Sequence, residues 1–143
     1  MTAARPADGP VIHAAKLPSR LPPEMLHIRP GSDGVVATDP LRSGWRYLSF
    51  RAFGLAAGET ALLDRPDQEA VVVTISGGGV EIAFDDRPGL HLEGRPSVFE
   101  GMPWTAYVPA GLTARLIGRP LAGRRAVVAV AQAPPSGRSG VAT

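Results

Sequence analysis

The amino-acid sequence predicts an all-β fold, a sandwich or a barrel, and three observations support it. Short segments rich in β-branched and aromatic residues alternate with turn signals about every ten residues. The 17 glycines and 15 prolines among 143 residues interrupt the chain too often for a helix bundle. The chain is 44% hydrophobic and 20% charged, which is enough for one domain with a packed core. It has no cysteine, which excludes a disulfide scaffold, a thiolate metal site and a cysteine nucleophile.

The chain divides into three parts. Residues 1–23 form a proline-rich N-terminal arm, because five prolines forbid a continuous helix there. Residues 24–133 form the β domain, and residues 134–143 form a flexible tail that begins at Pro134 and Pro135. The predicted strands of the β domain cover residues 25–29, 44–53, 60–64, 69–76, 80–84, 90–93, 97–99, 105–108, 113–117 and 126–131.

The early strands rest on alternation and on β-branched residues. In segment 44–53, Trp45, Tyr47 and Ser49 share one face, and Arg46 and Leu48 begin the other. Segment 69–76 contains five consecutive β-branched residues, 71–75, which favour a strand buried on both faces.

The later strands are separated by glycine-rich and aspartate-rich turns. Three consecutive glycines, 77–79, have strand-like segments on both sides and are therefore interpreted as a hairpin turn. Residues 80–84 alternate, with Val80, Ile82 and Phe84 on one face. Residues 85–89 form the next turn, and the remaining segments complete the sandwich.

Charge and hydropathy narrow the range of partners. The net charge is +2, and the arginines are scattered rather than arranged in a stripe, so nucleic-acid binding is not expected. No apolar run is long enough to span a membrane, and the N-terminus lacks the apolar stretch of a signal peptide. These features predict a soluble cytoplasmic protein that contacts neither nucleic acid nor membrane.

The histidines do not form a metal-binding pattern. His13, His27 and His91 are the only three, and none lies within four residues of another. A metal site on one strand needs ligands two residues apart, as in His-x-His, so we predict surface or structural histidines and no metal. The sequence also lacks a phosphate-binding loop and a nucleophile elbow, so no catalytic residue is assigned.

Carboxylates cluster at two turns. Asp64, Asp67 and Glu69 surround one turn, and Asp85 and Asp86 mark another. Aspartate is common in turns because it bonds the local backbone, so solvated turn residues are the alternative to a catalytic role.

Three residues are candidates for a substrate-binding pocket. Glu69 begins the most apolar strand, and Arg46 and Tyr107 also lie on apolar segments. The alternative is that all three are edge side chains with their polar ends in solvent.

Two segments resemble the signature motifs of cupins. The first runs from Gly58 to Gly77, and the second contains the sequence Pro-Ala-Gly at 109–111. The histidine slots of these motifs hold Asp64, Pro66 and Ala114, and Glu69 stands one position before the glutamate slot. The resemblance implies a cupin-type β-sandwich, or jelly-roll barrel, in which this chain lacks the metal-binding histidines.

A narrower resemblance covers residues 26–133. The sequence Leu-Glu-Gly-Arg-Pro-Ser-Val-Phe at 92–99, followed by Tyr-Val-Pro at 107–109, is similar to the 5-deoxy-glucuronate isomerase family of myo-inositol catabolism. Members of that family have two cupin halves, and this chain matches the N-terminal half. The resemblance implies an aldose–ketose isomerisation of a sugar acid, with a divalent metal held by the C-terminal half and no cofactor in this chain.

Three functions remain open at this point. The chain is an isomerase of this type, or a non-catalytic single cupin that binds a sugar acid or pairs with another cupin chain, or a small-molecule sensor with a cavity in the barrel. Measuring the metal content of the purified chain distinguishes the isomerase from the other two functions. We also expect a homo-oligomer, because a half of a two-cupin protein exposes the surface that its partner covers.

Overall fold

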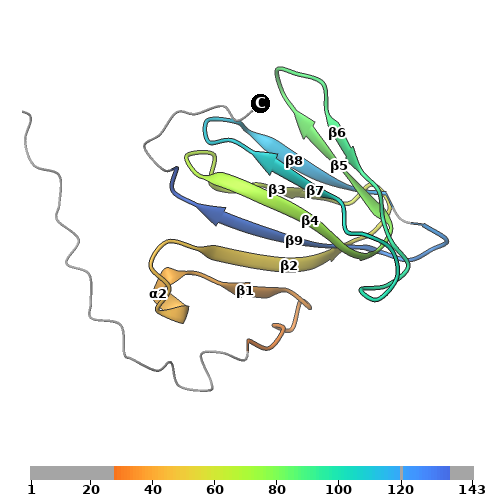
Figure 1. Cartoon of the computed structure of the whole chain (residues 1–143), viewed down its shortest axis with the longest axis horizontal. Helices are drawn as coiled ribbons and strands as arrows, with labels where there is room; N and C mark the ends of the chain where they lie inside the picture. Colours follow the sequence, from red (N-terminus) through yellow and green to blue (C-terminus); the bar gives the residue numbers. More distant parts are fainter. Residues whose placement is uncertain (1–27, 120, 136–143) are drawn as a thin grey trace, which may run out of the picture.

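Two antiparallel sheets pack face to face in the computed structural model, which describes residues 28–119 and 121–135 (Figure 1). The larger sheet has the strand order β1-β2-β9-β4-β7, and the smaller has the order β3-β8-β5-β6. All strand pairs are antiparallel, and neighbours in a sheet are often distant in the sequence. The all-β sandwich predicted from the sequence is confirmed.

The five-stranded sheet is built around the two longest strands. β4 (Glu69–Gly77) and β9 (Ala126–Ala133) pair along their lengths, with a bulge between Thr74 and Ser76. β2 (Ser49–Leu55) pairs with the other side of β9. The edges are the short strands β1 (Val36–Thr38) and β7 (Thr105–Val108).

The four-stranded sheet has β8 (Ala114–Arg119) and β5 (Gly79–Phe84) at its centre. Its edges are β3 (Thr60–Leu62) and β6 (Leu90–Leu92). The short helix α2 (Pro40–Ser43) joins β1 to β2; Asp39 caps its N-terminus and Gly44 ends it. Among the described residues, no helix has the length and apolar character needed to cross a lipid bilayer.

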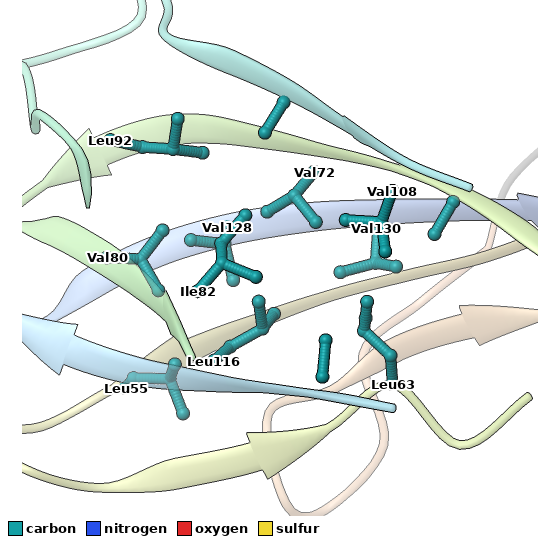
Figure 2. Close-up of a cluster of buried hydrophobic side chains, with 13 residues drawn as sticks. Leu55, Leu63, Val72, Val80, Ile82, Leu92, Val108, Leu116, Val128 and Val130 are labelled. Atoms are coloured by element: carbon teal, nitrogen blue, oxygen red, sulfur yellow. The ribbon is translucent and has the colours of Figure 1, made fainter. Parts of the chain in front are cut away.

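The core lies between the two sheets and consists of aliphatic side chains (Figure 2). Val72, Val128 and Val130 come from the larger sheet, and Ile82 and Leu116 come from the smaller. All five are essentially fully buried. Each contributes about 1.5–3 kcal/mol relative to an exposed side chain, so the core is the main source of stability.

The first half of the domain differs from the prediction. The strand predicted over 44–53 begins only at Ser49, because Gly44 adopts a left-handed conformation (φ 70°) at the end of α2. Helix α2 and strand β1 were not predicted, since each is too short to show a period. Of the segment 25–29, Ile28 and Arg29 are not in a strand, and the rest lies outside the described residues, as do the arm at 1–23 and residues 136–143 of the tail.

The hairpin predicted at glycines 77–79 is wrong. β4 ends at Gly77 in the larger sheet, and β5 begins at Gly79 in the smaller one, so the chain crosses between sheets here. Gly94 packs against the same corner. A Cβ atom on Gly77, Gly79 or Gly94 would overlap backbone atoms, so glycine at these positions lets the two sheets converge.

Two further predictions need correction. The segment 97–99 is not a strand: Ser97 and Glu100 form an isolated bridge that closes a turn. The strand at 71–75 is not buried on both faces. Val72 and Thr74 are fully buried, whereas Val71 and Val73 are half-buried on the outer face, where no described strand or helix covers them. The turn at 85–89, which joins β5 to β6, is confirmed.

Candidate functional site

Two of the three predicted pocket residues contact each other. The hydroxyl of Tyr107, on β7, donates a hydrogen bond to Oε2 of Glu69, on β4, over 2.9 Å. This bond to the carboxylate, then desolvation and then the carboxylate's charge raise the pKa of the Tyr107 hydroxyl above its ordinary value of 10.0. Tyr107 is 58% exposed, so the pair lies on the outer face of the sheet rather than in a pocket.

The third predicted residue, Arg46, lies elsewhere. It precedes β2, is exposed, and its guanidinium carbon is 5.0 Å from the centre of the Tyr47 ring. None of the three residues lines either of the two cavities described next. Glu69 and Tyr107 thus form a pair on the outer face of the larger sheet, and Arg46 stands apart from them.

A polar cavity of about 110 Å³ lies where β2 begins and β9 ends, between the larger sheet, α2 and the segment that leads into β4. We call it the mouth cavity. Three arginines contribute to its wall, together with the buried side chains of Ser49 and Gln132. Gln132 is 4% exposed, and its amide donates to the carbonyl of Arg65 over 3.4 Å. Its lining residues are Ala37, Thr38, Asp39, Arg42, Ser49, Phe50, Arg51, Asp64, Arg65, Val130 and Gln132.

A larger groove of about 570 Å³ follows the seam between β2 of one sheet and β3 of the other. We call it the seam groove. Phe53 and Leu55 give it an apolar floor, and Asp33, Glu59 and Thr60 provide hydrogen-bonding groups. This volume falls in the range of small-molecule sites, which combine apolar walls with a few polar groups. Its lining residues are Asp33, Gly34, Val35, Arg51, Phe53, Gly54, Leu55, Glu59, Thr60, Ala61 and Arg125.

Arg51 lines both cavities. Its Nη2 donates to the carbonyl of Leu62 over 3.0 Å and lies 3.3 Å from Oδ1 of Asp64, and its guanidinium carbon is 5.6 Å from the centre of the Phe53 ring. Its Nε is buried and has no hydrogen-bond partner. An unpaired buried donor costs about 1–3 kcal/mol, so an acceptor beside Arg51 would be stabilising.

The nearby carboxylates already have partners. Oδ1 of Asp39 accepts from the backbone N–H of Arg42, and Asp64 pairs with Arg51. Oε2 of Glu59 accepts from Nη2 of Arg125 over 2.9 Å and from the backbone N–H of Ala56 over 2.8 Å. Because these carboxylates already bond other groups of the protein, the arginines around the two cavities are suited to holding an anion.

The residues at the cupin metal slots do not fit a divalent metal. Ala114 points into the core, and Pro66 has no donor atom in its side chain. Glu69 precedes the inward-facing Ala70, and a shift of one residue along a strand sends the carboxylate to the opposite face. In residues 28–119 and 121–135, no three histidine, aspartate or glutamate side chains gather to hold an ion. His91 is exposed on β6, and His13 and His27 lie outside the described residues.

Sequence reasoning missed Arg51, although a signal was available. The alternation of β2 places Ser49, Arg51, Phe53 and Leu55 on the inner face, so an arginine interrupts a row that otherwise faces the core. The prediction followed alternation in 44–53 but considered only Arg46. Arg42 and Arg65 carry no comparable signal, because their positions depend on α2 and on the loop before β4.

The two-sheet topology and the comparison with solved structures show a cupin-type fold. A cupin protein from Bacteroides fragilis superposes with a TM-score of 0.52 at 12% identity, over 81% of this chain and 89% of that one, which shows the fold. The sequence profile of the KduI/IolB family matches residues 24–142, so the chain belongs to the KduI/IolB family.

Relatives support this assignment over part of their length. The chain is 34% identical over 86 residues to a protein named 5-deoxy-glucuronate isomerase from Geobacillus kaustophilus, and 32% identical over 84 residues to one from Geobacillus thermodenitrificans. Each match covers 57% of this chain and 30% of the relative. An IolB-like protein from Salmonella typhimurium LT2 superposes with a TM-score of 0.64 at 25% identity, over 78% of this chain and 41% of that one. The narrower resemblance seen in the sequence is thus confirmed.

Proposed function

We propose that this chain binds a sugar acid as the cupin module of a 5-deoxy-glucuronate isomerase-type protein, with the ligand carboxylate at Arg51. The observation that carries the proposal is the buried Nε of Arg51, which lacks an acceptor between two cavities. Family membership supports the choice of a sugar acid, since two relatives are named as isomerases of 5-deoxy-glucuronate. By the same reasoning, we place the protein in the breakdown of myo-inositol.

The dimensions of the two cavities suit such a ligand. The mouth cavity, at about 110 Å³, has room for a carboxylate but not for a whole sugar acid, since one water molecule occupies about 30 Å³. The seam groove can take the sugar body, with its carbon skeleton against Phe53 and its hydroxyls toward Asp33 and Glu59. A carboxylate paired with arginine gains charge-assisted hydrogen bonds, which are stronger than neutral ones.

We assign recognition rather than proton transfer to these residues. Aldose–ketose isomerisation moves a proton between adjacent carbons, and it requires an acid–base pair. The carboxylates around Arg51 are already bonded to Arg42, Arg51 and Arg125. The finer statement, turnover of 5-deoxy-glucuronate, therefore rests on family membership alone.

Titration calorimetry with D-glucuronate and with D-glucose tests the proposal. We expect saturable binding of D-glucuronate and none of D-glucose, because the two differ in the carboxylate. Arg51→Met keeps the length of the side chain and removes its charge. The Kd for glucuronate should rise at least about tenfold, since a hydrogen bond to a charged group contributes about 1.5–3 kcal/mol.

Arg115→Met is the matched control. Arg115 lies on β8 on the outer face of the smaller sheet, with Asp85 as its ion-pair partner at 3.8 Å. Its replacement should leave the Kd unchanged. Equal affinities of the wild type and Arg51→Met for glucuronate, or no saturation at millimolar concentrations, would reject the site.

A further inference from the structure

The two sheets have outer faces of opposite character. On each strand, the residues that alternate with the core-facing ones point outward. On the smaller sheet these include Glu81 and His91, together with Arg115 and Arg119. Arg119 forms an ion pair with Glu81 across the strands. Such a charged face is typical of the solvent-facing side of a sandwich.

The outer face of the larger sheet carries almost no charge. The strand register places Phe50 and Ala52 of β2, Val127, Ala129 and Ala131 of β9, and Val71 and Val73 of β4 on this surface. Glu69 is the one charged residue that the register places on it, and it stands at a corner, bonded to Tyr107. We call this surface the apolar face.

No described element covers the apolar face. The described strands contact one another along their edges and across the core, and α2 lies at the edge beside β1 (Figure 1). Val71, Val73, Phe50 and Ala131 retain intermediate exposure. A contiguous apolar surface without charges is the composition found at the centre of protein interfaces rather than on open surface.

The size of the apolar face indicates its partner. Five strands spaced about 4.8 Å apart, with central strands of 7 to 9 residues, form a face of roughly 20 by 25 Å, or about 500 Å². Two such faces in contact remove about 1,000 Å² from water, the lower limit for a specific interface. One extended segment would cover a strip only about 5–10 Å wide.

We propose that the apolar face is the contact surface between two copies of this chain, packed sheet on sheet about a two-fold axis. The same flat face on both copies is self-complementary, as a two-fold interface requires. Packed sheets lie about 10 Å apart with their strands offset by about 30°, which the twist of each sheet permits. Arg51, the anchor of the sugar-acid site, points to the opposite side of the sheet from this interface, and Phe50 borders both.

Ala131→Arg tests the interface, with Ala83→Arg as a matched control. Ala131 lies on central strand β9 between Phe50 and Val71, whereas Ala83 lies on the outer face of the smaller sheet. Sedimentation should give twice the 14.9 kDa chain mass for the wild type and for Ala83→Arg. Ala131→Arg should weaken the dimer on the order of 100-fold, because it buries an unpaired charge.

A second readout covers the case in which Ala131→Arg fails to fold. The chain contains no cysteine, so Ala131→Cys and Ala83→Cys each accept a single spin label. Two labels at Ala131→Cys should lie within roughly 30 Å, because packed sheets are close, and labels at Ala83→Cys should lie farther apart. A wild-type monomer at high micromolar concentration would overturn the proposal. A monomer in which another segment of the same chain covers residue 131 counts as this outcome. A dimer unaffected by Ala131→Arg with no short label distance would also overturn the proposal.

Discussion

At the scale of single residues, the Glu69–Tyr107 hydrogen bond couples the outer corner of the larger sheet to pH. The bond to the carboxylate raises the pKa of Tyr107, so the folded state holds this proton more tightly than the unfolded chain. The pair therefore stabilises the fold below about pH 10, and this stabilisation is lost as the pH rises through the raised pKa.

Replacing Glu69 should restore an ordinary tyrosine. The chain has two tyrosines, so in a Tyr47→Phe background the absorbance near 295 nm reports Tyr107 alone. We expect its midpoint above pH 10, and Glu69→Gln should lower the midpoint toward 10 by replacing the carboxylate that accepts the hydrogen bond and by removing its negative charge. Glu81→Gln, the same change on the other sheet, should leave it in place. An unchanged midpoint in Glu69→Gln would show that the bond does not persist in solution.

Gly111, in the Pro-Ala-Gly sequence of the second cupin motif, lies in a turn and has a φ of 93°. Its backbone N–H donates to the carbonyl of Pro66 over 2.7 Å, which ties the turn to the loop before β4. Gly111→Val should destabilise the protein by about 1–3 kcal/mol, because a β-branched residue is strained at positive φ. Pro134→Ala, in the segment after β9, should leave the thermal midpoint unchanged. Equal midpoints for the two variants would contradict a strained turn.

The type of a residue indicates a candidate site only where it departs from the local pattern, as a polar residue does on an apolar strand. Glu69 and Tyr107 were identified because they interrupt apolar strands, and the structure brings them together. The contact itself depends on the pairing of β4 with β7, which cannot be read from the sequence because the two residues are 38 positions apart. The seam groove could not be predicted, since it forms where β2 and β3 belong to different sheets.

At the scale of elements, the loop between β6 and β7 depends on Arg95. Its Nε donates to the carbonyl of Ile75 over 2.8 Å, and its Nη1 donates to that of Gly101 over 3.2 Å. The loop exposes Phe99 and Met102, which bury little surface of their own, so these bonds hold its shape. The bonds of Arg95 explain how the Gly-Arg-x-Ser-Val-Phe sequence keeps a defined conformation although it does not form the predicted strand.

Removing Arg95 should loosen this loop. Arg95→Met keeps the aliphatic part of the side chain and deletes the bonds to both carbonyls, so we expect a loss of about 2 kcal/mol in the free energy of unfolding. Urea denaturation measures the loss, and in a Trp45→Phe background the fluorescence of Trp104 reports the loop itself. Arg87→Met, on an exposed turn where Arg87 bonds Asp86, should cost little. A similar cost for the two variants would mean that the loop is held by other contacts.

Strands with a strong pattern were predictable, and connections between sheets were not. β4, β5, β7 and β9 carry β-branched or alternating residues and lie close to their predicted positions. The glycines at 77–79 resemble a hairpin turn locally. Only the packing of two sheets decides that β5 pairs with β8 instead of β4. Local turn chemistry cannot distinguish these outcomes.

At the scale of the whole molecule, packed apolar side chains rather than polar ligands fill the region where a cupin would hold its metal. Ala70 and Ala114 are buried in the same core as Val72 and Leu116. Ligands for a transition metal would have to come from three histidines at distant positions and from carboxylates, of which Asp64 and Glu59 already bond arginines. A weakly held hard ion at Asp64, largely hydrated, is the most that this set of donors favours.

We therefore expect the purified chain to hold no stoichiometric zinc, iron or manganese, and a chelator should leave its thermal midpoint unchanged. We also expect no interconversion of 5-deoxy-glucuronate and its keto isomer at an enzymatic rate by this chain alone, even where D-glucuronate binds at Arg51. Elemental analysis and a direct assay of the isomers measure these outcomes, with added divalent metal as the second condition. About one metal per chain would contradict the first expectation. Metal-dependent turnover that Glu69→Gln abolishes would contradict both, because the carboxylate on the outer face would then act in a site that the packing of β4 directs away from the core.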